Sequence, residues 1–213
     1  IKIINSKYGT YYNSIIGLIK IMYCNKKIIF VASDIDFLFS HRRNLVSFLI
    51  EQKSELLVYY AKGSPEIISW FKENKVEAIK LKGLSAKKDV LNTVVTIFYL
   101  VFAMYLKRPV LIHSIALKSI LVVALISSII PKKIRTIYSV AGIGSLFIDS
   151  TRHKFSKRIL SLTLKYLCAS RNSVFIFQNN DDLKLFEKIF GQISPKTVTI
   201  PGSGVELNRF IPR

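Results

Sequence analysis

Short apolar runs alternate with helical repeats along most of this chain. Residues 27–32 (KIIFVA) form a continuous apolar run, which is typical of a strand covered on both faces. In the next segment Leu45, Phe48 and Leu49 recur at helical spacing, and Ser40 has the position of an N-cap for a helix over 40–53. The same alternation predicts further strands at 56–61, 76–81, 110–113, 134–140, 173–177 and 197–200, and further helices at 65–74, 89–106, 115–130, 151–170 and 181–190.

This alternation predicts the fold class. Strands separated by helices build βαβ crossovers, which set consecutive strands parallel to one another. We therefore expect an α/β fold with a Rossmann-like, mostly parallel sheet and helices on both faces. The chain has 213 residues, of which 50% are hydrophobic, so it can bury one full core of this kind over residues 26–200.

Residues 1–25 do not share this pattern. They mix Ile, Tyr, Asn, Ser and Lys without a clear period, and Met22 lies just before the first predicted strand. We interpret them as an upstream extension, poorly ordered or not native, outside the fold. A secretory signal peptide is the alternative, but the apolar run 15–21 is short, is interrupted by Lys20 and lacks a small-residue cleavage site.

Two apolar segments raise the question of a membrane span. Residues 90–106 are apolar throughout, but they are fewer than the ~20 residues that a spanning helix needs. Residues 109–130 are long enough, yet they contain His113 and Lys118, and a central Lys costs roughly 2.5–3.5 kcal/mol on insertion. We expect buried or interfacial helices here, with a true span as the alternative.

The charge of the chain is strongly one-sided. The formal net charge is +19, and Asp149 is the only acidic residue between Val90 and Asn180. Such an imbalance favours polyanionic partners, which include nucleic acid, anionic lipid head groups and diphosphate substrates. Cys24 and Cys168 lie far apart without metal-ligand spacing, which suits free thiols in a reducing cytosol.

Candidate site residues follow three of the predicted strands. The carboxyl ends of parallel strands meet at one edge of a sheet and bind ligands there, so we expect these residues to converge at one rim. The first group is Ser40, His41 and Arg42 in the loop 33–42. The second is His113 at a strand end, with Lys118 one turn into the next helix. The third is Gly142 and Gly144 in the loop 141–147.

Each of these signals also has a structural interpretation. A single His at a strand end is often only hydrogen-bonded, and paired glycines often only form a tight turn. The first loop has no GxGxxG sequence, which argues against a nicotinamide or flavin cofactor. Asp34 and Asp36 are expected to shape their turn rather than to bind a metal.

In this order, five stretches resemble one family. They are Phe37 to Arg42 (FLFSHR); His113 with Lys118 five residues on; a Gly-x-Gly-x-x-Phe loop of Gly142, Gly144 and Phe147; Phe177, Gln178 and Asn179 followed by Asp181 and Asp182; and residues 200–212 (IPGSGVELNRFIP). Together they resemble the N-terminal domain of retaining family-four glycosyltransferases, in the bacterial branch that builds surface polysaccharides. The resemblance covers about residues 27–212, and its last two stretches are the most specific.

The chain departs from the family pattern at five positions. Four of the changes remove a hydroxyl, a ring or a fixed backbone, and the fifth keeps a carboxylate on a longer side chain. Glu206 stands where the family usually has Asp, Ala116 and Ser119 replace a Thr and a Pro, and Ala141 and Ser145 replace a Thr and a Tyr.

The resemblance implies half of a GT-B fold, in which two Rossmann-like domains face each other across a cleft. The N-terminal domain binds the acceptor and the C-terminal domain binds the nucleotide-sugar. Residues 201–213 would then begin the interdomain linker, and this chain alone is expected to be inactive. The implied acceptor-binding residues are Ser40, His41, Arg42, His113, Lys118, Gly142 and Gly144, and the implied interdomain residues are Gln178, Asn179, Gly202, Ser203, Gly204 and Glu206.

The implied reaction moves a hexosyl or N-acetylhexosaminyl group onto a polyprenyl-diphosphate-linked or polysaccharide acceptor, without a cofactor or metal. The implied partners are the nucleotide-sugar, the lipid-diphosphate-linked acceptor and an anionic membrane surface, on the inner face of the cytoplasmic membrane. The basic helix predicted over 151–170 suits such a surface, although its apolar residues would equally form a core stripe. Its membrane-facing candidates are Arg152, Lys154, Lys157 and Arg158.

Two other interpretations of the chain stay open. One is a non-catalytic remnant of a split gene. The other is a basic nucleic-acid-binding module, which the charge alone would permit. Against the second, no recognised nucleic-acid-binding motif is present and the aromatic residues lie in apolar runs. We therefore expect no nucleic-acid partner.

Overall fold

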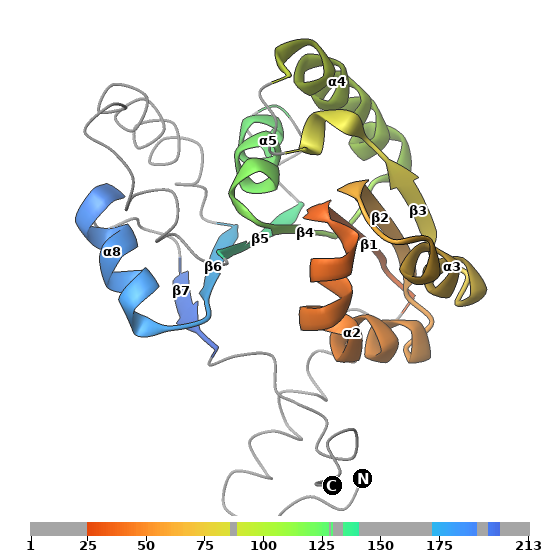
Figure 1. Ribbon diagram of the computed structural model, residues 1–213, viewed down its shortest axis with the longest axis horizontal. Helices are drawn as coiled ribbons and strands as arrows, with labels where there is room; N and C mark the ends of the chain where they lie inside the picture. Colours follow the sequence, from red (N-terminus) through yellow and green to blue (C-terminus); the bar gives the residue numbers. More distant parts are fainter. Residues whose placement is uncertain are drawn as a thin grey trace, which may run out of the picture.

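A computed structural model describes residues 25–85, 89–127, 129, 134–140, 172–190 and 196–200. In this part of the chain, seven strands form one sheet in the order β3-β2-β1-β4-β5-β6-β7, and every neighbouring pair is parallel. The predicted α/β, Rossmann-like class is confirmed (Figure 1). The strands are β1 (Lys27–Asp34), β2 (Glu55–Lys62), β3 (Glu77–Lys80), β4 (Leu111–Ile115), β5 (Arg135–Val140), β6 (Ser173–Phe177) and β7 (Lys196–Thr199).

Helices cover both faces of the sheet, as the sequence predicts. One core lies under α2 and α3, and the other lies under α4, α5 and α8. In Figure 1 the first pair of helices lies below the strands, and α4 and α5 lie above them. The helices are α2 (Ile35–Glu51), α3 (Pro65–Glu73), α4 (Val90–Lys107), α5 (Leu117–Ser127) and α8 (Asn180–Phe190), with a short 3-10 turn, η1 (Lys82–Leu84), before α4.

The central strand β1 explains why its sequence is a continuous apolar run. Ile29 and Val31 belong to the core under α4 and α5, whereas Ile28 and Phe30 belong to the core under α2 and α3. Because the sheet is covered on both faces, both sets of side chains leave water and no polar alternation remains.

Two boundaries differ from the sequence prediction. α2 begins at Ile35, directly after β1, and not at Ser40. β4 continues to Ile115, so His113 lies in the middle of the strand and not at its end. The turn into α5 follows at Ala116, whose φ of 72° lies in the left-handed region.

Gly83 fixes the start of α4 against the η1 turn. A Cβ at this position would lie 2.1 Å from the backbone oxygen of Asn92 and 2.5 Å from Oγ1 of Thr96. The backbone of α4 therefore approaches Gly83 too closely for any side chain, so the glycine sets how α4 rests on the sheet.

We expect Gly83→Ala to destabilise the domain by about 1–3 kcal/mol, because inserting a methyl group into a filled contact forces the backbone to shift. Urea unfolding followed by the emission of Trp70, the single tryptophan, measures the loss. Lys82→Ala is the matched control, since Lys82 is exposed in the same turn. Equal stability of the two variants would contradict the close contact.

Candidate functional site

The strand order of the sheet reverses between β1 and β4. β2 and β3 extend from β1 on one side, and β5, β6 and β7 extend from β4 on the other. In open parallel sheets, the crevice outside the carboxyl ends of the strands at this point is where ligands bind. The residues that end β1 and begin α5 therefore define the candidate site.

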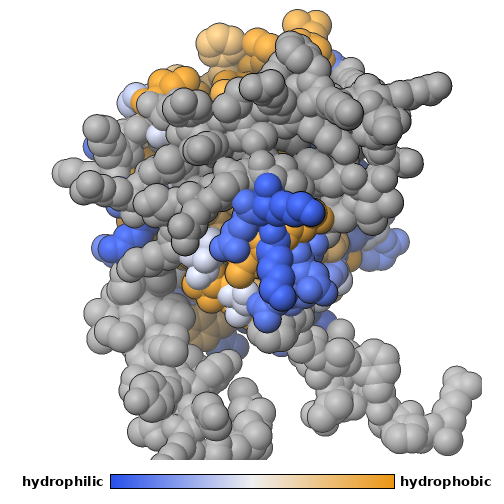
Figure 2. All heavy atoms as spheres, turned by 90° about the vertical axis from the view of Figure 1, so that its left-hand side faces the viewer, coloured by the Kyte–Doolittle hydropathy of each residue, from blue (hydrophilic) through white to orange (hydrophobic). Residues whose placement is uncertain are grey.

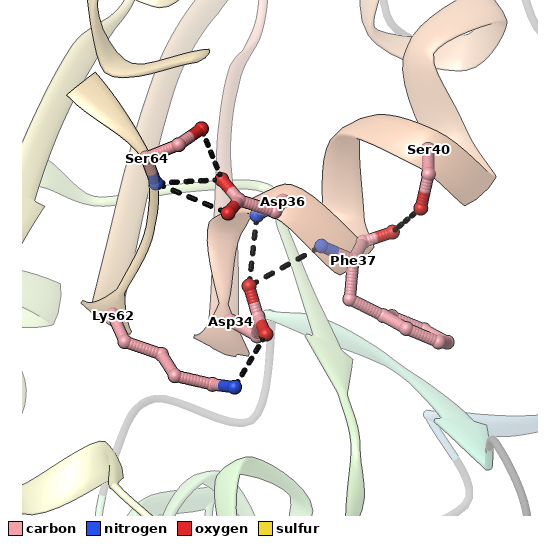
Figure 3. Close-up of polar contacts among 6 residues, drawn as sticks. All are labelled: Asp34, Asp36, Phe37, Ser40, Lys62 and Ser64. Atoms are coloured by element: carbon pink, nitrogen blue, oxygen red, sulfur yellow. Dashed lines mark hydrogen bonds and ion pairs between the residues drawn. The ribbon is translucent and has the colours of Figure 1, made fainter. Parts of the chain in front are cut away.

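Asp34 ends β1 and is the N-cap of α2. Its carboxylate accepts hydrogen bonds from the backbone amides of Asp36 at 2.9 Å and Phe37 at 3.3 Å. The same carboxylate forms an ion pair with Nζ of Lys62 at 2.8 Å, at the end of β2 (Figure 3). Burial raises the pKa of Asp34, but the hydrogen bonds from Lys62 and the two amides outweigh it, so the pKa lies below its ordinary value.

Asp36 fastens the first turn of α2 to the loop after β2. Its carboxylate accepts from the backbone amide of Ser64 at 2.9 and 3.1 Å and from the Ser64 hydroxyl at 3.0 Å (Figure 3). Together with Asp34, it fills the N-terminal end of α2 with carboxylates. In dinucleotide-binding Rossmann folds, the corresponding helix end receives a pyrophosphate.

Ser40 lies in the second turn of α2 and does not cap the helix. Asp34, six residues earlier, is the observed N-cap, because its backbone is extended and its short carboxylate reaches the free amides of the first turn. The Ser40 hydroxyl donates to the backbone oxygen of Phe37 at 3.1 Å and lies 2.8 Å from Nδ1 of His41. The His41 ring stacks on Phe37 with centroids 3.9 Å apart.

His113 is buried and only 2% exposed. Its Nε2 lies 2.8 Å from the Ser139 hydroxyl on β5, and its ring lies 5.3 Å from that of Phe30 on β1. Burial and the positive charge of Arg42 lower the pKa of His113 to about 3, so the ring is neutral at physiological pH. The positive charge of Arg42, a half-buried residue of α2, thus acts on His113 in the core.

Lys118 lies in the first turn of α5, against α4. Its Nζ donates to Oγ1 of Thr93 at 3.1 Å. The positive charge of Lys118 also reaches Asp89, the N-cap of α4, where hydrogen bonds from Asn92 are the main cause that lowers the carboxylate pKa. Lys118 is therefore a residue of the α4 and α5 side of the sheet, whereas Ser40, His41 and Arg42 lie on α2.

Several contacts at this edge were not found from the sequence. The hydroxyls of Ser33 and Ser119 lie 3.1 Å apart and join the end of β1 to the first turn of α5. Neither serine forms a recognisable motif, and only the parallel topology brings them together. A cap at Asp89 could have been found, because an acidic residue directly before a long apolar run is an N-cap signal.

Of the predicted interdomain residues, Gln178 and Asn179 lie after β6 at the same edge of the sheet. Asn179 acts at the start of α8, where its side-chain oxygen accepts from the amide of Asp182 at 2.6 Å. The remaining candidates, Gly142, Gly144, Arg152, Lys154, Lys157, Arg158, Gly202, Ser203, Gly204 and Glu206, lie outside the described residues.

No group of three or more His, Cys, Asp or Glu side chains gathers within the described residues. The two acidic residues at the carboxyl end of β1 and the start of α2 are Asp34 and Asp36. Lys62, Ser64 and two backbone amides already bind these carboxylates.

Comparison with known proteins finds solved structures with a similar fold. No protein-family model matches the chain, and no curated protein matches it in sequence. A glycosyltransferase from Rickettsia africae ESF-5 superimposes with a TM-score of 0.57 at 14% identity, over 83% of this chain and 43% of its own. The chain shares its fold with a glycosyltransferase.

The chain spans less than half the length of that enzyme. The MurG structure from Acinetobacter baumannii matches more loosely, with a TM-score of 0.40 at 8% identity, over 85% of this chain and 68% of MurG. At these identities the likeness concerns the fold alone.

We expect Asp34→Ala to lower the free energy of unfolding by about 1–2 kcal/mol at pH 7, because it removes an N-cap. Asp34→Asn keeps a capping oxygen but loses the ion pair with Lys62, so its loss is smaller. Because the folded-state pKa of Asp34 is lowered, its ionic contribution is present above the unfolded pKa and disappears as the pH falls. Urea unfolding at pH 7 and at low pH checks both statements, and equal losses for the two variants would contradict the cap.

His113 makes a separate prediction about pH. Its folded pKa lies below its unfolded value, so the unfolded chain takes up the proton first and stability falls as the pH drops below the unfolded pKa. The slope is about 1.4 kcal/mol for each pH unit below roughly 6.5. We expect His113→Gln to remove this slope between pH 7 and pH 5.5 in urea unfolding. His41→Gln keeps His113 intact and should retain it; a retained slope in His113→Gln would contradict the burial.

Proposed function

We propose that this chain supplies the acceptor-binding domain of a glycosyltransferase that moves a sugar from a nucleotide-sugar to a lipid-linked acceptor. The observation that carries the proposal is the seven-stranded, all-parallel sheet, which superimposes on a glycosyltransferase over 83% of this chain. Because the match covers only 43% of that enzyme, the proposal assigns the donor to a second domain.

The charges at the carboxyl edge support an acceptor role for this domain. Asp34 and Asp36 already occupy the N-terminal end of α2, where a nucleotide diphosphate would otherwise find free amides. A carboxylate at that end also repels phosphate. The helix end that binds a nucleotide in dinucleotide-binding folds is therefore unsuited to the donor in this domain.

The part of the carboxyl edge at α5 carries a positive charge instead of carboxylates. Lys118 lies in the first turn of α5, where the partial positive charge of a helix N-terminus adds to that of a side-chain cation. The proposal assigns the diphosphate of the acceptor to Lys118 and the acceptor sugar to Ser40, His41 and Arg42 on α2. His113 is a positioning residue in this scheme, because its buried ring joins β4 to β5.

The finer features of the proposal follow the family that the sequence resembles. They are a hexosyl or N-acetylhexosaminyl donor, a polyprenyl-diphosphate acceptor and a place at the inner face of the cytoplasmic membrane. Retention of the configuration at the transferred sugar and membership of family four are further features that we propose from this resemblance. The positive net charge of the chain supports an anionic acceptor and an anionic surface.

We expect the chain to bind a soluble short-prenyl diphosphate carrying N-acetylglucosamine, and not to bind the corresponding nucleotide-sugar. Lys118→Gln should weaken binding by about tenfold or more, because a charge-assisted hydrogen bond to phosphate is lost. Lys72→Gln, at an exposed position near the far end of α3, is the matched control. Isothermal titration calorimetry measures both.

A nucleotide-sugar that binds more tightly than the prenyl diphosphate would overturn the assignment of the acceptor to this domain. Equal affinity in Lys118→Gln and Lys72→Gln would overturn the role of Lys118 alone.

A further inference from the structure

The outer side of α4 is an exposed apolar surface in the part of the chain that the structure describes. Figure 2 shows hydrophobic side chains at the top of the molecule, where Figure 1 places α4. Phe98 is 71% exposed and Phe102 is 63% exposed, although both are large apolar residues. We call this surface the outer face of α4; it consists of Val90, Leu91, Val94, Val95, Phe98, Tyr99, Phe102, Tyr105 and Leu106.

The inner side of the same helix is fixed to the domain. Leu100 and Met104 are buried in the core that α4 shares with α5. At one end Lys107 pairs with Glu77 of β3 at 3.3 Å, and at the other end Thr93 accepts from Lys118 of α5. The helix therefore lies along the domain surface with both ends attached.

This attachment decides between crossing a membrane and lying on one. By length and composition α4 could span a bilayer, since its 18 residues have a mean hydropathy of 1.7 and only 22% of them are buried. A spanning helix would have to withdraw Leu100 and Met104 from the core and leave the sheet open. A helix that lies in the plane of the interface keeps these contacts and buries only its outer face.

We propose that the outer face of α4 inserts into the interfacial region of an anionic lipid bilayer. Lys107 ends the helix, Arg108 follows it, and Lys118 contacts its first turn. α4 itself contains no acidic residue, and its N-cap Asp89 is the one carboxylate directly before it. Cations at both ends of an apolar stripe fit anionic head groups on either side of the inserted side chains.

The charge also argues against a second copy of the chain as the occupant. Two copies that joined through α4 would bring net charges of +19 together, with cations at both ends of each stripe. Anionic lipid neutralises the same cations and covers the same apolar side chains. Tyr99 and Tyr105 fit this occupant as well, because a tyrosine keeps its ring in the apolar layer and its hydroxyl in the polar one.

The outer face of α4 lies beside the candidate site, and its role in acceptor binding rests on the proposed function. The first turn of α4 contacts Lys118, so the stripe begins beside the edge to which the acceptor diphosphate is assigned. An acceptor anchored in the same bilayer would reach that edge without leaving the membrane.

Vesicle flotation of the 213-residue chain tests the insertion without any substrate. We compare Phe98→Ser/Phe102→Ser with Val198→Ser/Ile200→Ser, a double change at exposed apolar positions of the far end of the sheet. Loss of two inserted rings should weaken partition to vesicles containing phosphatidylglycerol by on the order of tenfold per phenylalanine. The control variant should bind the vesicles as the wild type does. Added salt should weaken the binding of the wild type and of the control variant.

Three results would overturn the proposal. The first is that the Phe98→Ser/Phe102→Ser variant binds vesicles as strongly as the wild type. The second is that proteases cleave the chain on both sides of sealed vesicles, which would indicate a spanning helix. The third is a dimer that forms without lipid and that the two phenylalanine changes abolish. Trp70 packs at the α2 and α3 face, so unchanged emission shows that a variant is folded. Failure of flotation leaves acceptor binding in solution untouched, so the two proposals fail separately.

Discussion

The carboxylate of Asp34 controls the edge of the sheet on which the candidate site depends. It is the last residue of β1, it caps α2 through two backbone amides, and it pairs with Lys62 at the end of β2. α2 can therefore begin without any intervening loop. Asp36 then fastens the same turn to Ser64. Both neighbours of the crevice, the central strand and its first crossover, are held in position by these two acidic side chains.

Fixing α2 in this way divides the edge by charge. The side of the crevice under α2 carries carboxylates that are already paired, while the side at α5 carries Lys118. Between them, Ser33 and Ser119 join β1 to α5 through their hydroxyls. The same packing of α2 brings Arg42 near His113 and keeps the imidazole neutral and enclosed. The chemistry offered to a ligand is therefore that of the rim, and the histidine contributes by holding neighbouring strands together.

The sheet and its helices could be predicted from the sequence because a strand covered on both faces is apolar over most of its length, as β1 is. The start of α2 could not, since Ser40 and Asp34 are equally good capping residues by type. The choice between them depends on Lys62 and Ser64, more than 25 residues away. The sequence predicted that β4 ends at His113, at the open rim of the sheet. The strand ends two residues later, at Ile115, so His113 lies in the buried core. Several motifs of the resemblance, among them Gly142, Gly144 and residues 201–212, lie outside the described residues and stay predictions.

The two sides of α4 show where sequence patterns stop being informative. A helix that is apolar all round is expected to be buried on every side, and its sequence does not reveal which side meets the domain. Here Leu100 and Met104 meet the core, while Phe98 and Phe102, on the opposite side of the same helix, do not. The close approach of Gly83 to Asn92 and Thr96 fixes which side of the helix faces the domain. The described residues leave this apolar face exposed, and a bilayer with anionic head groups, as we propose, would match both the apolar side chains and the positive charge of the chain.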